Sequence, residues 1–277
     1  MNTYTKREIT KGIITIIFFG TALLFIFPFI WMLSTSFKNE MDVLEIPIRL
    51  IPKQWNFENY KKVWTENSFL HYYMNSFKVT ILTVLGDLCL TSMAAYAFAR
   101  LKFRGKNIIF ALYMATMMIP AQVLLLPKYI LFRSLHLTNT HAALILPGIF
   151  SIFSTFLLRQ FFMTIPYDLT EAAKIDGAGH FLTFSKVILP LAKPGLTTLV
   201  LVSFIWSWND YINPLIFVSD TKKYTLTVGL QLFQRSNGTN YAVIMAGAVC
   251  AVLPVIILFL VMQKQFIESF ASSGIKG

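Results

Sequence analysis

An aromatic ring and three polar side chains stand close together near the end of one apolar run. Trp206, Asn209, Asp210 and Asn213 are spaced i, i+3, i+4 and i+7, so one continuous helix would place them on a single face. Such a stripe could line a translocation path or hydrogen-bond across to a second subunit, and the spacing does not favour either. Pro214 is expected to free carbonyl groups near Asp210 and to kink this helix.

A further carboxylate, Asp87, lies inside another apolar run. An ionisable group in hydrocarbon costs several kcal/mol and normally faces a cavity or a partner helix, so Asp87 joins the candidate path residues. Cys89 and Cys250 also lie in apolar runs without a partner at metal-ligand spacing, and we expect core thiols. Neither a catalytic cluster nor a GxxxxGK[ST] phosphate loop occurs. We therefore expect no catalytic residue, metal or cofactor, and any ATP is bound by another subunit.

The composition indicates an integral membrane protein, because 56% of the 277 residues are hydrophobic and only 13% are charged. A helix needs roughly 20 apolar residues to cross a bilayer. Runs of this length lie near 12–33, 76–99, 107–127, 141–162, 195–218 and 240–262. The sequence thus predicts an all-α, polytopic protein that is a single transmembrane domain over 1–277, with six spans and both termini on one side.

Basic residues in the short connections predict the orientation. Arg100, Lys102, Arg104 and Lys106 crowd the turn between the second and third runs, which places this turn in the cytoplasm. Both termini are then cytoplasmic as well. The net charge of +11 is explained by this topology and by anionic lipid headgroups. No basic and aromatic cluster of the kind that binds nucleic acid is present.

A polar insert over about 166–194 separates the fourth and fifth runs, and the same topology places it in the cytoplasm. Asp168 stands three residues before Glu171, a spacing typical of a helix-capping box. Gly177 and Gly179 permit a left-handed turn, and a second helix from about His180 is expected to stop near Pro190. The insert therefore predicts a helix-turn-helix. Its small residues, which suit close docking, are Ala172, Ala173 and Ala178.

These motifs together resemble a known family. EAA at 171–173, DGA at 176–178, Phe184 and LPL at 189–191 follow the cytoplasmic loop of binding-protein-dependent ABC importer permeases, close to the MalG-like carbohydrate permeases. FIWSWNDYINPLIF over 204–217 resembles the tryptophan, asparagine and acidic segment of their fifth span. The SSGIKG ending resembles their glycine-lysine-glycine tail, although Ile275 stands where many relatives have valine.

The resemblance implies that the first helix of the insert sits in a cleft of a cytoplasmic ATPase and couples ATP-driven closure to opening of the permease. It further implies that Glu171 holds the helix start or pairs with a basic residue, that Asp176 orders the turn and that Gly177 supplies backbone freedom. The ATPase-coupling residues are expected to be Glu171, Ala172, Ala173, Asp176, Gly177 and Ala178. The implied partners are a second, homologous permease in a heterodimer, two ATPase copies that bind ATP and Mg²⁺, and an extracytoplasmic solute-binding protein.

The expected function is inward transport of a carbohydrate across the inner membrane. On the candidate path, the Trp206 ring could stack on the apolar face of a sugar while the amides and the carboxylate bond its hydroxyl groups. A non-sugar solute such as a sugar phosphate is the alternative cargo. From another class, a membrane enzyme would need catalytic clusters that the sequence lacks, and a channel would leave the coupling loop unexplained.

Overall fold

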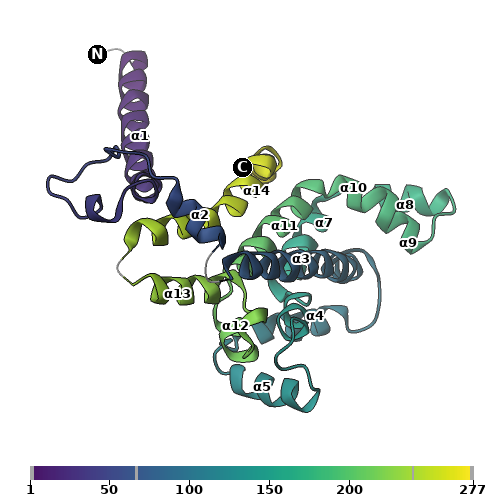
Figure 1. Cartoon of the computed structure of the whole chain (residues 1–277). Coiled ribbons are helices and arrows are strands. Elements are labelled where there is room, and N and C mark those ends of the chain that lie inside the picture. Colours follow the sequence, from purple (N-terminus) through teal and green to yellow (C-terminus); the bar gives the residue numbers. More distant parts are fainter. Residues whose placement is uncertain (1–2, 66–67, 239, 275–277) are drawn as a thin grey trace. The chain divides into compact units, whose positions relative to one another are not determined.

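A computed structural model describes residues 3–65, 68–238 and 240–274 (Figure 1). All regular secondary structure in these ranges is helical, as the sequence predicts. The final residues of the SSGIKG ending, 275–277, lie outside the described ranges. The chain divides into unit 1, Met1–Phe69 with Leu230–Leu253, and unit 2, Leu70–Gly229 with Pro254–Gly277.

Most helices follow one another with short connections, whereas residues 43–57 form a longer connection between η1 and α2. In chain order they are α1 Thr3–Ser36, η1 Glu40–Asp42, α2 Glu58–Thr65, α3 Phe69–Arg100, α4 Lys106–Ala115, η2 Thr116–Met118, α5 Leu125–Ser134, α6 Ala142–Gly148, α7 Ile152–Thr164, α8 Asp168–Ile175, α9 His180–Leu182, the π-helix η3 Thr183–Ile188, α10 Leu189–Leu191, α11 Lys193–Trp208, α12 Ile212–Phe217, η4 Thr221–Lys223, α13 Leu226–Asn237 and α14 Tyr241–Gly274.

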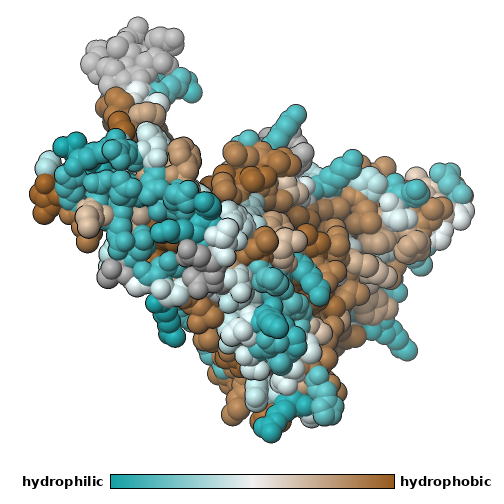
Figure 2. Space-filling view, viewed as in Figure 1, coloured by the Kyte–Doolittle hydropathy of each residue, from teal (hydrophilic) through white to brown (hydrophobic). Residues whose placement is uncertain are grey.

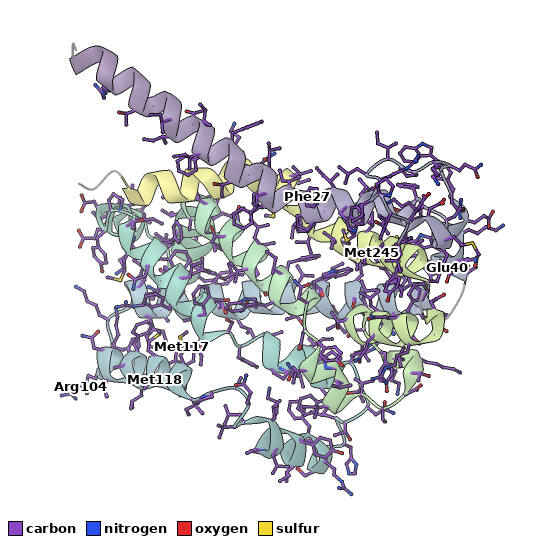
Figure 3. All side chains as sticks on the ribbon, turned by 90° about the vertical axis from the view of Figure 1, so that its left-hand side faces the viewer. Phe27, Glu40, Arg104, Met117, Met118 and Met245 are labelled. Atoms are coloured by element: carbon purple, nitrogen blue, oxygen red, sulfur yellow. The ribbon has the colours of Figure 1, made fainter. Side chains whose placement is uncertain are left out.

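In unit 1, α1 exposes apolar side chains all round, including Phe18 and Phe27, the latter labelled in Figure 3. Such a surface suits lipid rather than water. The C-terminal end of α1 is capped by Asn59, whose side-chain amide donates to the carbonyl oxygens of Ser36 and Lys38 at 2.9 and 2.8 Å. The end of the helix is thereby satisfied by the chain itself.

Among the described residues of unit 2, two apolar cores lie along α3. One contains Tyr96 of α3 with Leu158 of α7 and Ile188 of η3. The other contains Val79 of α3 with Phe217 of α12. Thr83 and Asp87 lie between them on α3, so the polar part of this helix is held between two packed ends. Hydrophobic atoms also cover much of the side of unit 2 visible in Figure 2, as expected for a lipid-facing surface.

The number of continuous candidate spans is smaller than the sequence predicts. Among the described residues, four stretches are long and apolar enough to cross a membrane: Thr10–Ser36, Phe69–Arg100, Ala142–Thr164 and Tyr241–Lys264. A fifth candidate span is obtained if two helical stretches that meet at a bend of 81° are counted as one span, namely His180–Leu191 and Lys193–Trp208. The protein is therefore an all-helical polytopic membrane protein with four to five candidate spans.

Two predicted spans are interrupted at prolines. The run 107–127 is not one helix, because Pro120 excludes Ile119 from helical geometry and Ile119 is extended at φ −79° and ψ 117°. The run 195–218 breaks after Trp208 and resumes at Ile212. Pro214 has no N–H to offer the carbonyl of Asp210, which explains the break.

Candidate functional site

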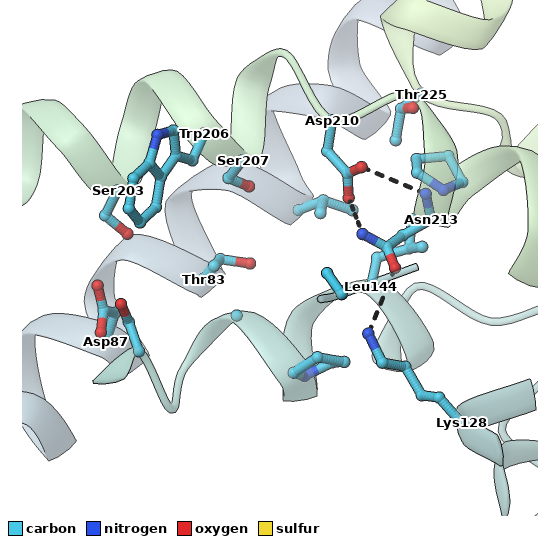
Figure 4. Close-up of a pocket in the computed structure, with 16 residues that line it drawn as sticks. Thr83, Asp87, Lys128, Leu144, Ser203, Trp206, Ser207, Asp210, Asn213 and Thr225 are labelled. Carbon is cyan, nitrogen blue, oxygen red and sulfur yellow. Dashed lines mark hydrogen bonds between the residues drawn. The ribbon is translucent and has the colours of Figure 1, made fainter. Parts of the chain in front are cut away.

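A cavity of about 450 Å³ lies within unit 2 and contains most of the candidate path residues (Figure 4). Its wall comes from α3, α5, α6, α11, α12 and loop segments next to them. The lining residues are Val79, Thr83, Asp87, Ala121, Lys128, Leu144, Pro147, Gly148, Ser151, Ser203, Trp206, Ser207, Asp210, Asn213, Pro214 and Thr225.

Asp210 and Asn213 form one connected polar group in this cavity. The Asp210 carboxylate accepts from the backbone N–H of Asn213 at 3.2 Å and from its side-chain amide at 2.8 Å. Lys128, from α5, points toward the same pair and lies 3.5 Å from the Asn213 side-chain oxygen (Figure 4). The Thr227 hydroxyl donates to the Asp210 carbonyl at 2.6 Å. Asp210 thus satisfies the start of α12 in the manner of a helix cap while its charge faces the cavity.

Asp87 lies at the other end of the cavity in Figure 4 and is only 1% exposed. Its two oxygens accept from the Thr91 hydroxyl at 2.7 Å and from the Ser154 hydroxyl at 2.9 Å. The first bond stays within α3 and the second joins α3 to α7. A buried carboxylate needs such donors, because an unbonded charge in a low-dielectric interior is strongly unfavourable.

The predicted stripe is wrong as a single helical face. Trp206 belongs to α11, whereas Asp210 follows the end of that helix and Asn213 belongs to α12. The break nevertheless brings these three residues to one cavity. Asn209 does not line the cavity, because its amide turns back to the carbonyl of Ile205 at 2.9 Å and its side chain is exposed.

Sequence reasoning did not identify several polar lining residues. Lys128 directly follows the third apolar run, which was the available signal for it. Thr83, Ser203 and Ser207 carry no such signal, because small hydroxyl residues are common in membrane helices at packing contacts. Ser207 donates to Thr80 at 3.3 Å and in this way joins α11 to α3.

The insert forms the helix-turn-helix that its glycines predict. At the end of α8, Gly177 has φ 82°, its N–H donates to Lys174 at 3.0 Å, and the N–H of Ala178 donates to Ala173 at 2.8 Å. This pair of bonds is a Schellman turn, which favours glycine at the left-handed position. Gly179, at φ −68°, does not share that conformation.

The start of this hairpin differs from the expected detail, whereas its second helix ends near Pro190 as expected. Asp168 does not cap α8 as a capping box, because Tyr167 holds the cap position and makes no side-chain capping bond. Asp168 and Glu171 instead lie in the first turn, where their negative charges interact favourably with the positive end of the helix dipole. The second helix passes Pro190 and ends at Leu191, before α11 begins at Lys193.

The exposed side of the hairpin combines charge and apolar surface. Glu171, Ala172 and Asp176 are exposed, whereas Ala173 is buried against the rest of unit 2. The exposed large apolar side chains of the hairpin include Leu169, Ile175, Phe181, Leu182 and Leu191. Beside them, a recess of about 630 Å³ is lined by Arg100, Lys102, Tyr167, Glu171, Lys174 and His180, among others.

A family model described as "Binding-protein-dependent transport system inner membrane component" matches residues 87–268. This range includes Asp87, the whole hairpin and the Asp210 end of the cavity.

Similar proteins cover nearly the whole chain. The arabinooligosaccharides transport system permease protein AraQ of Bacillus subtilis is 34% identical, covering 95% of this chain and 95% of that protein. The diacetylchitobiose uptake system permease protein NgcG of Streptomyces coelicolor is 32% identical, covering 90% and 83%. The sn-glycerol-3-phosphate transport system permease protein UgpE of Yersinia pestis is 31% identical, covering 91% and 92%.

Solved structures agree with this likeness. A chain of a bacterial ABC transporter involved in the import of the acidic polysaccharide alginate has a TM-score of 0.84 at 28% identity, covering 96% of this chain and 100% of that one. A chain of an alginate ABC transporter in complex with an alginate pentasaccharide-bound periplasmic protein shares the fold, with a TM-score of 0.66 at 11% identity. The chain therefore belongs to the binding-protein-dependent transport system inner membrane components, as the multi-pass permease of an ABC importer whose ATPase is a separate protein.

Proposed function

We propose that this permease carries an uncharged carbohydrate and that the cavity of Figure 4 forms its half of the translocation path. The observation that carries the proposal is the convergence of Trp206 with Asp210 and Asn213 on one cavity within unit 2. An indole ring offers a flat apolar surface, and the carboxylate and amide offer acceptors and donors for hydroxyl groups. The names of AraQ and NgcG, which refer to oligosaccharides, agree with such a cargo.

The charges in the cavity favour an uncharged cargo over an anionic one. Asp87 and Asp210 contribute two formal negative charges, and Lys128 contributes the single formal positive charge among the lining residues. The Lys128 ammonium group is already directed at the Asp210–Asn213 pair. An anionic solute would therefore meet a formally negative wall, which opposes its entry. The sugar phosphate alternative has weaker support from this half of the path.

The path is tested by comparing Asn213→Ala with Asn209→Ala in a reconstituted transporter. Each change removes one amide side chain, and the two positions are four residues apart, but only Asn213 lines the cavity. Asn213→Ala is expected to lower transport about fivefold, the effect of losing a hydrogen bond worth roughly 1 kcal/mol. The transport rate of Asn209→Ala should remain close to that of the unmodified protein. Equal effects of the two changes would contradict the assignment of this cavity to the path.

The cargo class is tested with candidate solute-binding proteins. ATPase activity of the purified complex would be measured with each binding protein loaded with an uncharged oligosaccharide or with a sugar phosphate. Stimulation by an oligosaccharide-loaded protein supports the proposed cargo. Stimulation only by the sugar phosphate form would show that the cargo is anionic and that this wall does not select against it.

We also propose that the exposed side of α8 is the docking surface for an ATPase subunit. Glu171 and Asp176 supply charge, the apolar side chain of Ile175 is 85% exposed, and that of Phe181 in the neighbouring α9 is 72% exposed. Large apolar groups exposed beside charged residues are typical of a protein interface. The proposed assembly contains this chain, a second homologous permease, two ATPase subunits that bind ATP and Mg²⁺, and an extracytoplasmic solute-binding protein.

The proposed topology retains six crossings, with both termini in the cytoplasm. Its support is the six apolar runs and the basic turn 100–106. The interrupted segments are compatible with membrane crossing, because broken helices occur at membrane depth where they line a cavity or are covered by protein. Ala121 and Pro214, which lie in the two interruptions or next to them, both line the cavity.

A further inference from the structure

Arg100 is a buried cation at the cytoplasmic end of α3 and makes unusual contacts there. Its side chain is 5% exposed, and one terminal nitrogen donates to the carbonyl oxygens of Phe162 and Ile165 at 2.5 Å each. These carbonyls belong to the last turn of α7 and its C-cap. Pro166 ends that helix, because it holds Ile165 in an extended conformation and leaves the final carbonyls without N–H partners. Arg100, which belongs to α3, therefore caps the C-terminal end of α7.

Two further hydrogen bonds join α3 to α7. Asp87 accepts from Ser154 at 2.9 Å at the cavity, and Arg159 donates to the carbonyl of Phe98 at 3.3 Å closer to the cytoplasmic end. Between these bonds, Tyr96 packs in one core with Leu158. Since 13 residues separate Asp87 from Arg100, the two helices are joined over about 20 Å. The pair forms a continuous connection from the cavity to the end of α7.

The connection continues into α8 through three residues. Ile165, Pro166 and Tyr167 lead from α7 to α8, and the Arg100 guanidinium group lies 5.8 Å from the centre of the Tyr167 ring. Arg100 thus contacts the carbonyl of the first residue of this linker and the ring of its last residue. A cation with a planar fork of donors suits two acceptors and a ring at once, which a lysine ammonium group does less well.

We propose that Arg100 is a positioning residue that makes α3, α7 and α8 move together, so that motion at the ATPase reaches the cavity. The inference rests on the proposed docking role of α8. Without Arg100, the end of α7 would lose its partner, and α8 could shift without moving α3. Transport would then become uncoupled from ATP hydrolysis while the subunits remain assembled.

The test compares Arg100→Met with Arg104→Met in the complete transporter reconstituted in proteoliposomes with its binding protein. Both changes remove one positive charge from the same basic turn, but Arg104 is exposed and projects away from the helices (Figure 3). Arg100→Met is expected to lower the amount of solute moved per ATP about tenfold, within the range that coupling residues show. Arg104→Met should leave this ratio unchanged, and Arg100→Lys should restore part of it.

An unchanged ratio in assembled Arg100→Met would overturn the proposal, as would equal losses in the two methionine variants. If Arg100→Met does not assemble, Arg100→Lys decides, because the ammonium group preserves charge without the planar fork. A normal ratio in the lysine variant would then assign Arg100 to folding alone. Cross-linking from Ala172→Cys to the ATPase separates the two proposals. If Ala172→Cys forms no cross-link to the ATPase in a chain that keeps Arg100, the proposed docking role of α8 is wrong. This outcome does not depend on the results for the Arg100 variants.

Discussion

Gly177 has a backbone conformation that residues with a side chain rarely adopt. Its φ of 82° is left-handed, and a Cβ atom built there would meet nothing within 4 Å. A substitution is therefore opposed by the backbone and not by crowding. Gly179, two residues later, has equally open space and an ordinary φ of −68°. The two glycines form a matched pair that separates conformation from size.

Gly177→Val is expected to lower transport and ATP turnover together while the protein remains in the membrane. A β-branched residue in the left-handed region costs on the order of 1–3 kcal/mol, which the end of α8 must absorb by changing its turn. Uptake and ATPase activity would be measured together with the amount of protein in the membrane. Gly179→Val is the control and should affect both activities little. Normal uptake by the Gly177 variant would count against the coupling role of α8.

At the scale of elements, α3 and the end of α6 approach so closely that only small residues fit between them. A Cβ atom on Gly86 would lie 2.3 Å from Cγ2 and 2.9 Å from Cβ of Ile149. A Cβ atom on Gly148 would lie 2.5 Å from Cγ2 of Thr83. Small residues allow such approach in membrane helices, where packing replaces the hydrophobic effect as the main attraction. This contact holds one wall of the cavity.

Gly86→Ala is expected to destabilise unit 2 by about 1–3 kcal/mol, the usual cost of overpacking, because Cβ of Ile149 cannot move away by rotation of its side chain. The thermal unfolding midpoint in detergent should fall. Gly20→Ala is the matched control, since Gly20 is also inside a long apolar helix but has nothing within 4 Å. A midpoint for Gly86→Ala at or above that of the control would show that α3 and α6 do not meet in this way.

At the scale of the whole molecule, the membrane topology depends on the interrupted segment between Arg104 and Ser134. The basic turn before it predicts a cytoplasmic start, but α4 is only 10 residues long, and residues 104–134, all of which the structure describes, contain no continuous candidate span. If this segment crosses the membrane, the six-crossing topology holds and the residues on either side of it face opposite compartments. If it does not cross, Arg104 and Ser134 share one side.

Single cysteines at these two positions are expected to differ in labelling. In a background with Cys89 and Cys250 replaced by alanine, Ser134→Cys should react with an impermeant maleimide on intact cells. Arg104→Cys should react only after the membrane is permeabilised. Transport by each variant would confirm that the labelled protein is functional. Labelling of both cysteines under the same condition would exclude a crossing between them and reduce the number of spans.

The sequence by itself determined the features that depend on interactions between residues close together in the chain. The apolar runs indicated a helical membrane protein, the insert motifs indicated the family, and the Gly177 turn followed from residues within one helical turn of each other. Pro214 marked one place where a helix is redirected, whereas only the structure showed the break at Pro120, which interrupts the run 107–127. These signals are local, because backbone conformation and hydropathy act between near neighbours in the chain.

Only the tertiary structure decided which side chains meet. Asp87 bonds Ser154, 67 residues away, Lys128 approaches Asn213, 85 residues away, and Arg100 reaches Phe162, 62 residues away. It also separated Asn213, which lines the cavity, from Asn209, which does not. No periodicity within one segment encodes such pairs, because they depend on how α3, α7, α11 and α12 pack and on where the breaks redirect the chain.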